Sequence, residues 1–155
     1  MATALVTGSG RGIGKAIAIE LAAQGFDIAL NDLADSEEIA RTVDEVREKG
    51  VRCEFFAADV SKHEDVAAMC AEAEKELGAV EVLVCSAGIN RDALFLRMKD
   101  EDWQAVLNVD LNAGDTRVPF DAAGKILLQN GCESGYMEPK GYCVSEVLNH
   151  VGNDL

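Results

Sequence analysis

Apolar and polar residues follow two different periods along the first 112 residues of the chain. Four short and largely apolar runs are typical of buried β-strands: 4–6, 26–30, 52–58 and 80–85. Between these runs, apolar residues recur at helical spacing, as at Ile13, Ile17 and Leu21. This alternation predicts an α/β fold, a doubly wound parallel sheet of Rossmann type with right-handed crossovers.

Polar residues mark the expected ends of the helices. Asp35 to Glu38 and Ser61 to Glu64 both have the spacing of a capping box, so a helix is expected to begin at each. Gly50 and Gly78 are expected to end these two helices.

The first strand runs directly into a turn with glycines at 8, 10, 12 and 14. Glycine lets the backbone approach a pyrophosphate, whose charge is met by free amide groups and the positive end of the helix dipole. A strand, such a turn and a helix in succession indicate a dinucleotide-binding site. A glycine-rich loop without a ligand is the alternative.

Further polar residues are expected at the same edge of the sheet, because the carboxyl ends of parallel strands meet there. Asp32, Asp59 and Ser86 to Gly88 each follow a predicted strand. Asp32 is placed to accept hydrogen bonds from the adenosine ribose, which favours NAD(H). Arg11 argues for NADP(H), since a guanidinium binds a 2′-phosphate well. The alternatives are a solvated turn residue for Asp32, a surface cation for Arg11 and a helix N-cap for Asp59.

Composition narrows the classes of partner. The 155 residues carry 14 Lys and Arg against 28 Asp and Glu, so a net charge of −14 repels nucleic acid and anionic membranes. The five cysteines are spread singly, and the two histidines are far from metal-ligand spacing, so we expect free thiols and no metal site. The chain begins on a core strand without a signal-peptide pattern, and we expect a cytoplasmic location.

The helix expected from Asp100 carries Asp110 on the same face as Val106 and Leu107, where a carboxylate must be paired or point into a cleft. Beyond Asn112 the pattern weakens, although 125–128 is a possible strand or helix and 142–151 has helical spacing. We therefore assign residues 1–112 to a dinucleotide-binding Rossmann portion and 113–155 to a divergent C-terminal segment of the same domain. The sheet is expected to be truncated after its fourth or fifth strand.

Residues 2 to about 112 resemble the N-terminal half of the short-chain dehydrogenase/reductase family, and within it the branch of 3-oxoacyl-[acyl carrier protein] reductases. The likeness rests on TGSGRGIG at 7–14, DV at 59–60, CSAG at 85–88 and GINRD at 88–92. It implies NAD(P)-dependent hydride transfer to a carbonyl such as a 3-oxoacyl thioester, in fatty acid biosynthesis. The cofactor contacts implied are Thr7, Gly8, Ser9, Arg11, Gly12, Ile13, Gly14, Asp32, Asp59, Val60, Ser86, Ala87 and Gly88.

The catalytic residues of the family carry over less well. Asp110 stands where the family has the Asn of a water relay. Tyr136 has Lys140 at YxxxK spacing, but a proline and a glycine beside Lys140 disfavour a regular helix. Tyr142 lies in a more helical context, yet Glu146 replaces the family's Lys, and a carboxylate raises the pKa of a nearby phenol. Both tyrosines stay candidates for the general acid.

Two functional hypotheses follow from this resemblance. The first is a reductase of 3-oxoacyl thioesters, with an acyl carrier protein thioester as the substrate. The second is an inactive or truncated remnant that keeps the dinucleotide site as a binding or interaction module. A sheet without its later strands leaves an apolar edge uncovered, so we expect a homo-oligomer.

Overall fold

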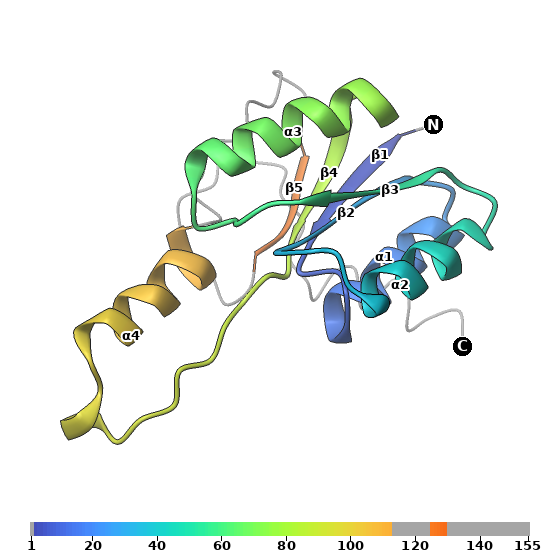
Figure 1. Ribbon diagram of the computed structural model, residues 1–155. Coiled ribbons are helices and arrows are strands. Elements are labelled where there is room, and N and C mark those ends of the chain that lie inside the picture. The colour runs from blue at the N-terminus through green and yellow to red at the C-terminus, as the bar shows by residue number, and fades with distance from the viewer. Residues whose placement is uncertain (1, 113–124, 130–155) are drawn as a thin grey trace.

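The computed structural model describes residues 2–112 and 125–129, which form one parallel sheet flanked by helices (Figure 1). The strands are β1 (Thr3–Thr7), β2 (Asp27–Asp32), β3 (Cys53–Ala57), β4 (Val80–Cys85) and β5 (Lys125–Gln129). The α-helices are α1 (Gly12–Ala23), α2 (Glu37–Arg47), α3 (His63–Leu77) and α4 (Asp100–Val106). A 3-10 turn, η1 (Phe95–Arg97), precedes α4, and a π-helical turn, η2 (Leu107–Asn112), follows it.

The strands lie in the order β3-β2-β1-β4-β5, and every pair is parallel. Leu5 in the central β1 pairs with Ala29 of β2 on one side and with Leu83 of β4 on the other. The strand order therefore reverses between β1 and β4, and ligands of open α/β sheets bind at such a switch point. The predicted doubly wound sheet is confirmed. Residues 125–128, for which the sequence allowed either a strand or a helix, belong to β5.

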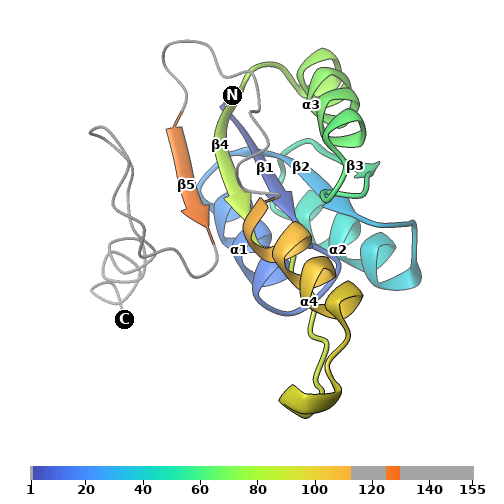
Figure 2. The ribbon, with the colours of Figure 1, turned by 90° about the vertical axis from the view of Figure 1, so that its left-hand side faces the viewer.

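Helices cover both faces of the sheet (Figures 1 and 2). Val6 packs in one core cluster with Ala18 of α1 and Val46 of α2, whereas Leu5 packs in another with Met69 of α3. Successive side chains of a strand point to opposite faces, so β1 is apolar throughout because both faces are covered. Figure 2 shows α4 beyond the carboxyl ends of β1 and β4. None of the helices in the described ranges is long and apolar enough to cross a membrane.

The start of α2 differs by one residue from the prediction. Ser36 is the N-cap, and its hydroxyl accepts a hydrogen bond from the Ile39 amide at 3.2 Å. Asp35 therefore lies one residue before the cap. Both residue types suit this position, and the sequence spacing did not separate them.

The capping box predicted from Ser61 to Glu64 was wrong. α3 begins at His63, and no side-chain hydrogen bond caps it at Lys62. The Ser61 hydroxyl instead donates to Asp59 at 2.6 Å, and the Ser61 amide donates to the same carboxylate oxygen at 3.0 Å, so Ser61 belongs to the turn before α3.

Candidate functional site

The turn between β1 and α1 requires a close backbone approach that glycine alone permits. A Cβ on Gly14 would overlap the Gly8 carbonyl oxygen, and a Cβ on Gly8 would lie 2.7 Å from the Ala87 Cα. Gly8 and Gly12 also have φ angles of +61° and +58°, in the left-handed region that favours glycine. A Cβ on Gly12 would meet no atom within 4 Å. The turn is therefore packed tightly against the end of β4 and is open at Gly12.

The N-terminus of α1 is not capped by a side chain. Its N-cap residue Arg11 has extended backbone, at φ −157° and ψ 175°, and makes no capping hydrogen bond. The first turn of the helix contains no acidic residue. The amides of this turn and the positive end of the helix dipole are therefore available to an anion.

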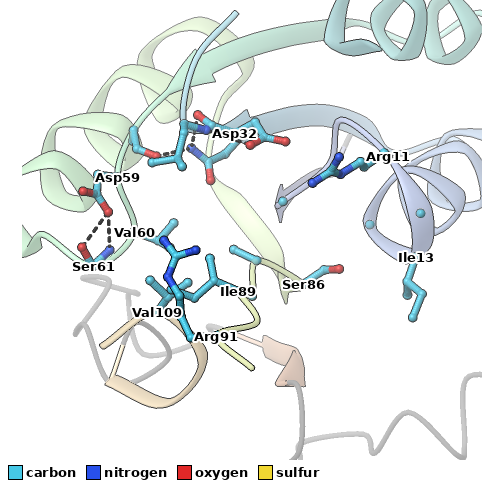
Figure 3. A pocket seen from close by; sticks show the side chains of 18 residues that line it. Arg11, Ile13, Asp32, Asp59, Val60, Ser61, Ser86, Ile89, Arg91 and Val109 are labelled. Atoms are coloured by element: carbon cyan, nitrogen blue, oxygen red, sulfur yellow. Dashed lines mark hydrogen bonds between the residues drawn. The ribbon is translucent and has the colours of Figure 1, made fainter. Parts of the chain in front are cut away.

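A cavity of about 600 Å³ opens at the carboxyl ends of β1 to β4 (Figure 3). Every predicted cofactor residue except Thr7 and Ser9 lines this cavity. Its other lining residues are Asn31, Leu33, Ala58, Ser61, Ile89, Arg91 and Val109. The structure thus brings the glycine turn, Asp32, Asp59 and the segment after β4 to one place, while their contact with a dinucleotide stays a prediction.

Thr7 and Ser9 hold the turn from beneath. The Thr7 hydroxyl oxygen accepts hydrogen bonds from the amides of Ser86 and Ala87, both at 3.1 Å. The fully buried Ser9 donates its hydroxyl to the Asn31 carbonyl at 3.0 Å. These contacts give both residues a structural role in positioning the turn.

Asp32 ends β2 with its carboxylate fixed by backbone amides. One oxygen accepts from the Leu33 amide at 2.9 Å, and the other accepts from the Gly10 amide at 3.2 Å. Each carboxylate oxygen retains a second lone pair. A hydroxyl donor entering the cavity would therefore meet an acceptor that is already oriented.

Asp59 lies on the opposite side of the cavity from the glycine turn, as Figure 3 shows. It accepts from the Ser61 hydroxyl at 2.6 Å and from the Ser61 amide at 3.0 Å, with the Lys62 ammonium at 3.4 Å. These donors, Ser61 first, hold the pKa of the Asp59 carboxyl below its usual range. Asp59 is thus held as an anion, and the alternative of an N-cap for α3 is not what the structure shows.

Asn31 is a cavity residue to which the sequence pattern gave no role. Its side chain is nearly fully buried and donates to the carbonyls of Phe56 at 3.1 Å and Ala58 at 3.2 Å. The signal that identifies it is a polar residue at the end of an otherwise apolar run.

Arg91 is a second lining residue without a predicted role, although it lies in the GINRD stretch. It comes from the segment between β4 and α4, and its Nε lies 4.0 Å from Asp102. Arg11 and Arg91 make no hydrogen bond through their side chains to residues within 2–112 and 125–129. Both guanidinium groups thus keep N–H donors available to a ligand.

Asp110 lies in the π-helical turn η2. Its carboxylate is hydrogen-bonded, which is one of the two environments expected from the sequence. Its carboxylate accepts from the Ile89 amide at 2.8 Å, and it lies 3.5 Å from where a Cβ of Gly88 would be. π-Helical turns are rare and are frequent at functional sites. Asp110 thereby ties η2 to the wall of the cavity.

The candidate general acids Tyr136 and Tyr142, together with Lys140, lie outside the described residues. Cys53, Cys70 and Cys85 are free thiols, as expected. Burial raises their pKa values to about 12, 11 and 11, so all three are protonated at neutral pH. No cluster of His, Cys, Asp or Glu suited to a metal occurs among the described residues.

Comparison with known proteins gives a family match over most of this chain. The model of the family described as short chain dehydrogenase matches residues 2–114. A 3-oxoacyl-[acyl-carrier-protein] reductase FabG from Staphylococcus epidermidis is 39% identical over 109 residues, which are 70% of this chain and 45% of that protein. The short-chain reductase protein NovJ from Streptomyces niveus is 42% identical over 128 residues, 83% of this chain and 48% of that protein.

A solved structure shares the fold. The putative short-chain alcohol dehydrogenase from Sinorhizobium meliloti superposes with a TM-score of 0.76 at 29% identity, covering 82% of this chain and 53% of the other. The chain spans about half the length of these relatives.

Proposed function

The chain belongs to the short-chain dehydrogenase family, and we propose that the cavity beside α1 binds a nicotinamide dinucleotide for an NAD(P)-dependent oxidoreductase reaction. The observation that carries this proposal is the uncapped N-terminus of α1 at a 600 Å³ cavity that also has a fixed carboxylate at the end of β2. The two features together suit a dinucleotide such as NAD, because it carries a diphosphate and a ribose at a set separation.

The described residues fit the separate parts of such a cofactor. The amides of the turn from Gly8 to Gly14 suit the diphosphate, and Asp32 suits the adenosine ribose. Asp59 and Val60, which line the same cavity, are the proposed acceptor and apolar contact for the adenine ring. When bound, the nicotinamide supplies or accepts the hydride, and this chain's residues orient the cofactor.

NAD(H) is the proposed cofactor over NADP(H). If Asp32 binds the adenosine ribose as proposed, its carboxylate would repel the 2′-phosphate of NADP, because like charges at hydrogen-bond distance repel. Arg11 lines the same cavity. Its guanidinium could bind a 2′-phosphate, which supports NADP(H) as the alternative. We give Asp32 more weight than Arg11 because two backbone amides hold its carboxylate in place.

The proposed reaction is reduction of a 3-oxoacyl thioester, and its support is the likeness to FabG proteins over 70% of the chain. Tyr142 or Tyr136, the latter with Lys140, is the proposed acid. An acyl carrier protein thioester is the corresponding substrate, and the proposed setting is fatty acid biosynthesis in the cytoplasm.

A second candidate function is a dinucleotide-binding module without catalysis, acting by association with another chain. It is favoured by Asp110, which replaces the family's relay Asn with a group that cannot donate a hydrogen bond when ionised. It is also favoured by Leu96 of η1 and Trp103 of α4, which are 95% and 57% exposed. Apolar side chains so placed support self-association.

Titration with NADH and NADPH tests the binding proposal. Gly12→Asp places a carboxylate in the open part of the turn, where it repels the diphosphate, and we expect binding to be lost. Gly50→Asp is the matched control, because Gly50 also has positive φ, at +83°, and free space, but lies outside the cavity. Equal NADH binding by Gly12→Asp and the parent protein would contradict the proposal.

An acetoacetyl-thioester assay with saturating cofactor separates the two functions. Turnover that is lost in Tyr142→Phe or Tyr136→Phe supports the reductase and identifies its acid. Cofactor binding without turnover supports the binding module.

A further inference from the structure

The charged side chains around the cavity differ in how closely they are paired with hydrogen-bond or ion-pair partners. Asp32 and Asp59 are both engaged by nearby donors, at distances of 2.6 to 3.2 Å. Among the described residues, the Arg91 side chain pairs only with Asp102, at 4.0 Å from its Nε, and it is 55% exposed. A guanidinium with so weak a partner gains more from a ligand than either carboxylate does.

The position of Arg91 distinguishes it from Arg11. Figure 3 shows Arg11 beside the glycine turn, whereas the Arg91 guanidinium points into the cavity toward Val60, on the Asp59 side. Ile89 and Val109 also line this cavity, and Figure 3 shows them on the same side of it as Arg91. Arg91 thus belongs to an apolar part of the cavity, away from the amides that suit a diphosphate.

A planar cation beside aliphatic side chains suits a flat aromatic ring. A guanidinium is weakly hydrated and stacks on aromatic faces, while Val60 and Val109 provide dispersion contacts to the same ring. On the basis of the proposed function, we infer that Arg91 stacks on the purine ring of the dinucleotide and is a specificity-determining residue for the adenine half. We expect no contact between Arg91 and the nicotinamide half of the cofactor.

Arg91→Met tests this inference, because methionine keeps an apolar side chain and loses the charged plane. The probes are NADH, ADP and reduced nicotinamide mononucleotide, titrated by calorimetry or fluorescence. We expect dissociation constants for NADH and ADP to rise about three- to fivefold, as for an exposed cation–π contact, and that of the mononucleotide to stay unchanged. Arg97→Met is the control, since Arg97 is exposed in the same segment but does not line the cavity.

Arg91→Lys separates stacking from charge. Lysine keeps the charge without the plane, so stacking predicts a loss on ADP close to that of Arg91→Met. Unchanged ADP affinity in Arg91→Met would overturn the inference. Weakened binding of all three probes, with recovery in Arg91→Lys, would also overturn it and assign Arg91 to a phosphate.

These outcomes are distinct from failure of the proposed function. If the parent protein binds neither NADH nor ADP, the proposed function and the inference both fall. If the parent binds both and Arg91→Met does so equally, only the inference falls.

Discussion

The backbone carbonyl of Asn31 accepts two hydrogen bonds from Ser9, one from its amide and one from its hydroxyl, each at 3.0 Å. The Asn31 side chain meanwhile donates to the carbonyls of Phe56 and Ala58 at the end of β3. One nearly fully buried residue thus joins the glycine turn to the strand end that leads to Asp59. The two halves of the cavity are held in register through Asn31.

We expect Asn31→Leu to lower the free energy of unfolding by about 2 kcal/mol, because the Phe56 and Ala58 carbonyls lose their buried donor. Ser9→Ala should cost about 1 kcal/mol, since the Ser9 amide still donates to Asn31. Urea unfolding of both variants measures the difference. A larger loss in Ser9→Ala than in Asn31→Leu would show that the Asn31 side chain is not the main connection.

Asp32→Asn should shift cofactor preference toward NADPH. The amide keeps one oxygen that can accept from a backbone amide but removes the charge facing the 2′-phosphate, a change of about tenfold in the ratio of NADPH to NADH affinity. Parallel titrations measure this ratio. Asp35→Asn is the control, because Asp35 is an exposed acid of the same loop that does not line the cavity. An unchanged ratio in Asp32→Asn would remove Asp32 as the discriminating group.

The ion pair between Asp27 and Arg52 should make the free energy of unfolding depend on pH. Asp27 is 1% exposed and accepts from Arg52 Nη2 at 2.7 Å, while Arg52 also donates to the Leu77 carbonyl at 2.7 Å. Burial opposes ionisation of Asp27, but the hydrogen bonds and charge of Arg52 outweigh it, so its pKa lies below the ordinary value of 3.8. A lowered folded pKa stabilises the protein fully above the unfolded pKa, and this stability is lost as pH falls through the folded value.

Arg52→Met should lower the free energy of unfolding at pH 7 by about 2 kcal/mol, because the buried Asp27 carboxylate keeps the backbone amide of residue 52 but loses the guanidinium that balances its charge. The loss should shrink as the pH falls and Asp27 becomes protonated, because protonation removes the charge that Arg52 balances. Arg41→Met is the control, since the Arg41–Glu37 pair is largely exposed and should cost little. Denaturation at a series of pH values measures both, and a loss in Arg52→Met that did not change with pH would exclude this pairing as its cause.

Asp110→Asn and Asp110→Leu separate the charge of this residue from its hydrogen bond. Asparagine keeps an oxygen that accepts from the Ile89 amide, so we expect NADH affinity within twofold of the parent. Leucine leaves that amide without its partner and should weaken NADH binding about tenfold, the value of one buried hydrogen bond. Equal binding by both variants would show that Asp110 does not position the cavity wall.

Local patterns predicted most of the fold because burial on both faces leaves a strong signal. The run at 80–85 coincides with β4 (Val80–Cys85), and the run at 26–30 overlaps β2 (Asp27–Asp32). The errors lie at helix starts, where Ser36 takes the place expected for Asp35 and Ser61 turns to Asp59. Several polar side chains within two or three residues can form hydrogen bonds there, and sequence spacing does not show which of them caps the helix.

The sequence by itself determined the parallel α/β sheet, the glycine turn and the edge to which Asp32 and Asp59 belong, since these depend on local periodicity and on glycine's conformational freedom. Tertiary structure alone decided that Thr7 and Ser9 lie beneath the cavity and that Asn31, Arg91 and Val109 line it. It also decided that Asp110 pairs with Ile89, 21 residues away. Such contacts join residues distant along the chain, and their geometry arises only when the strands and helices pack together.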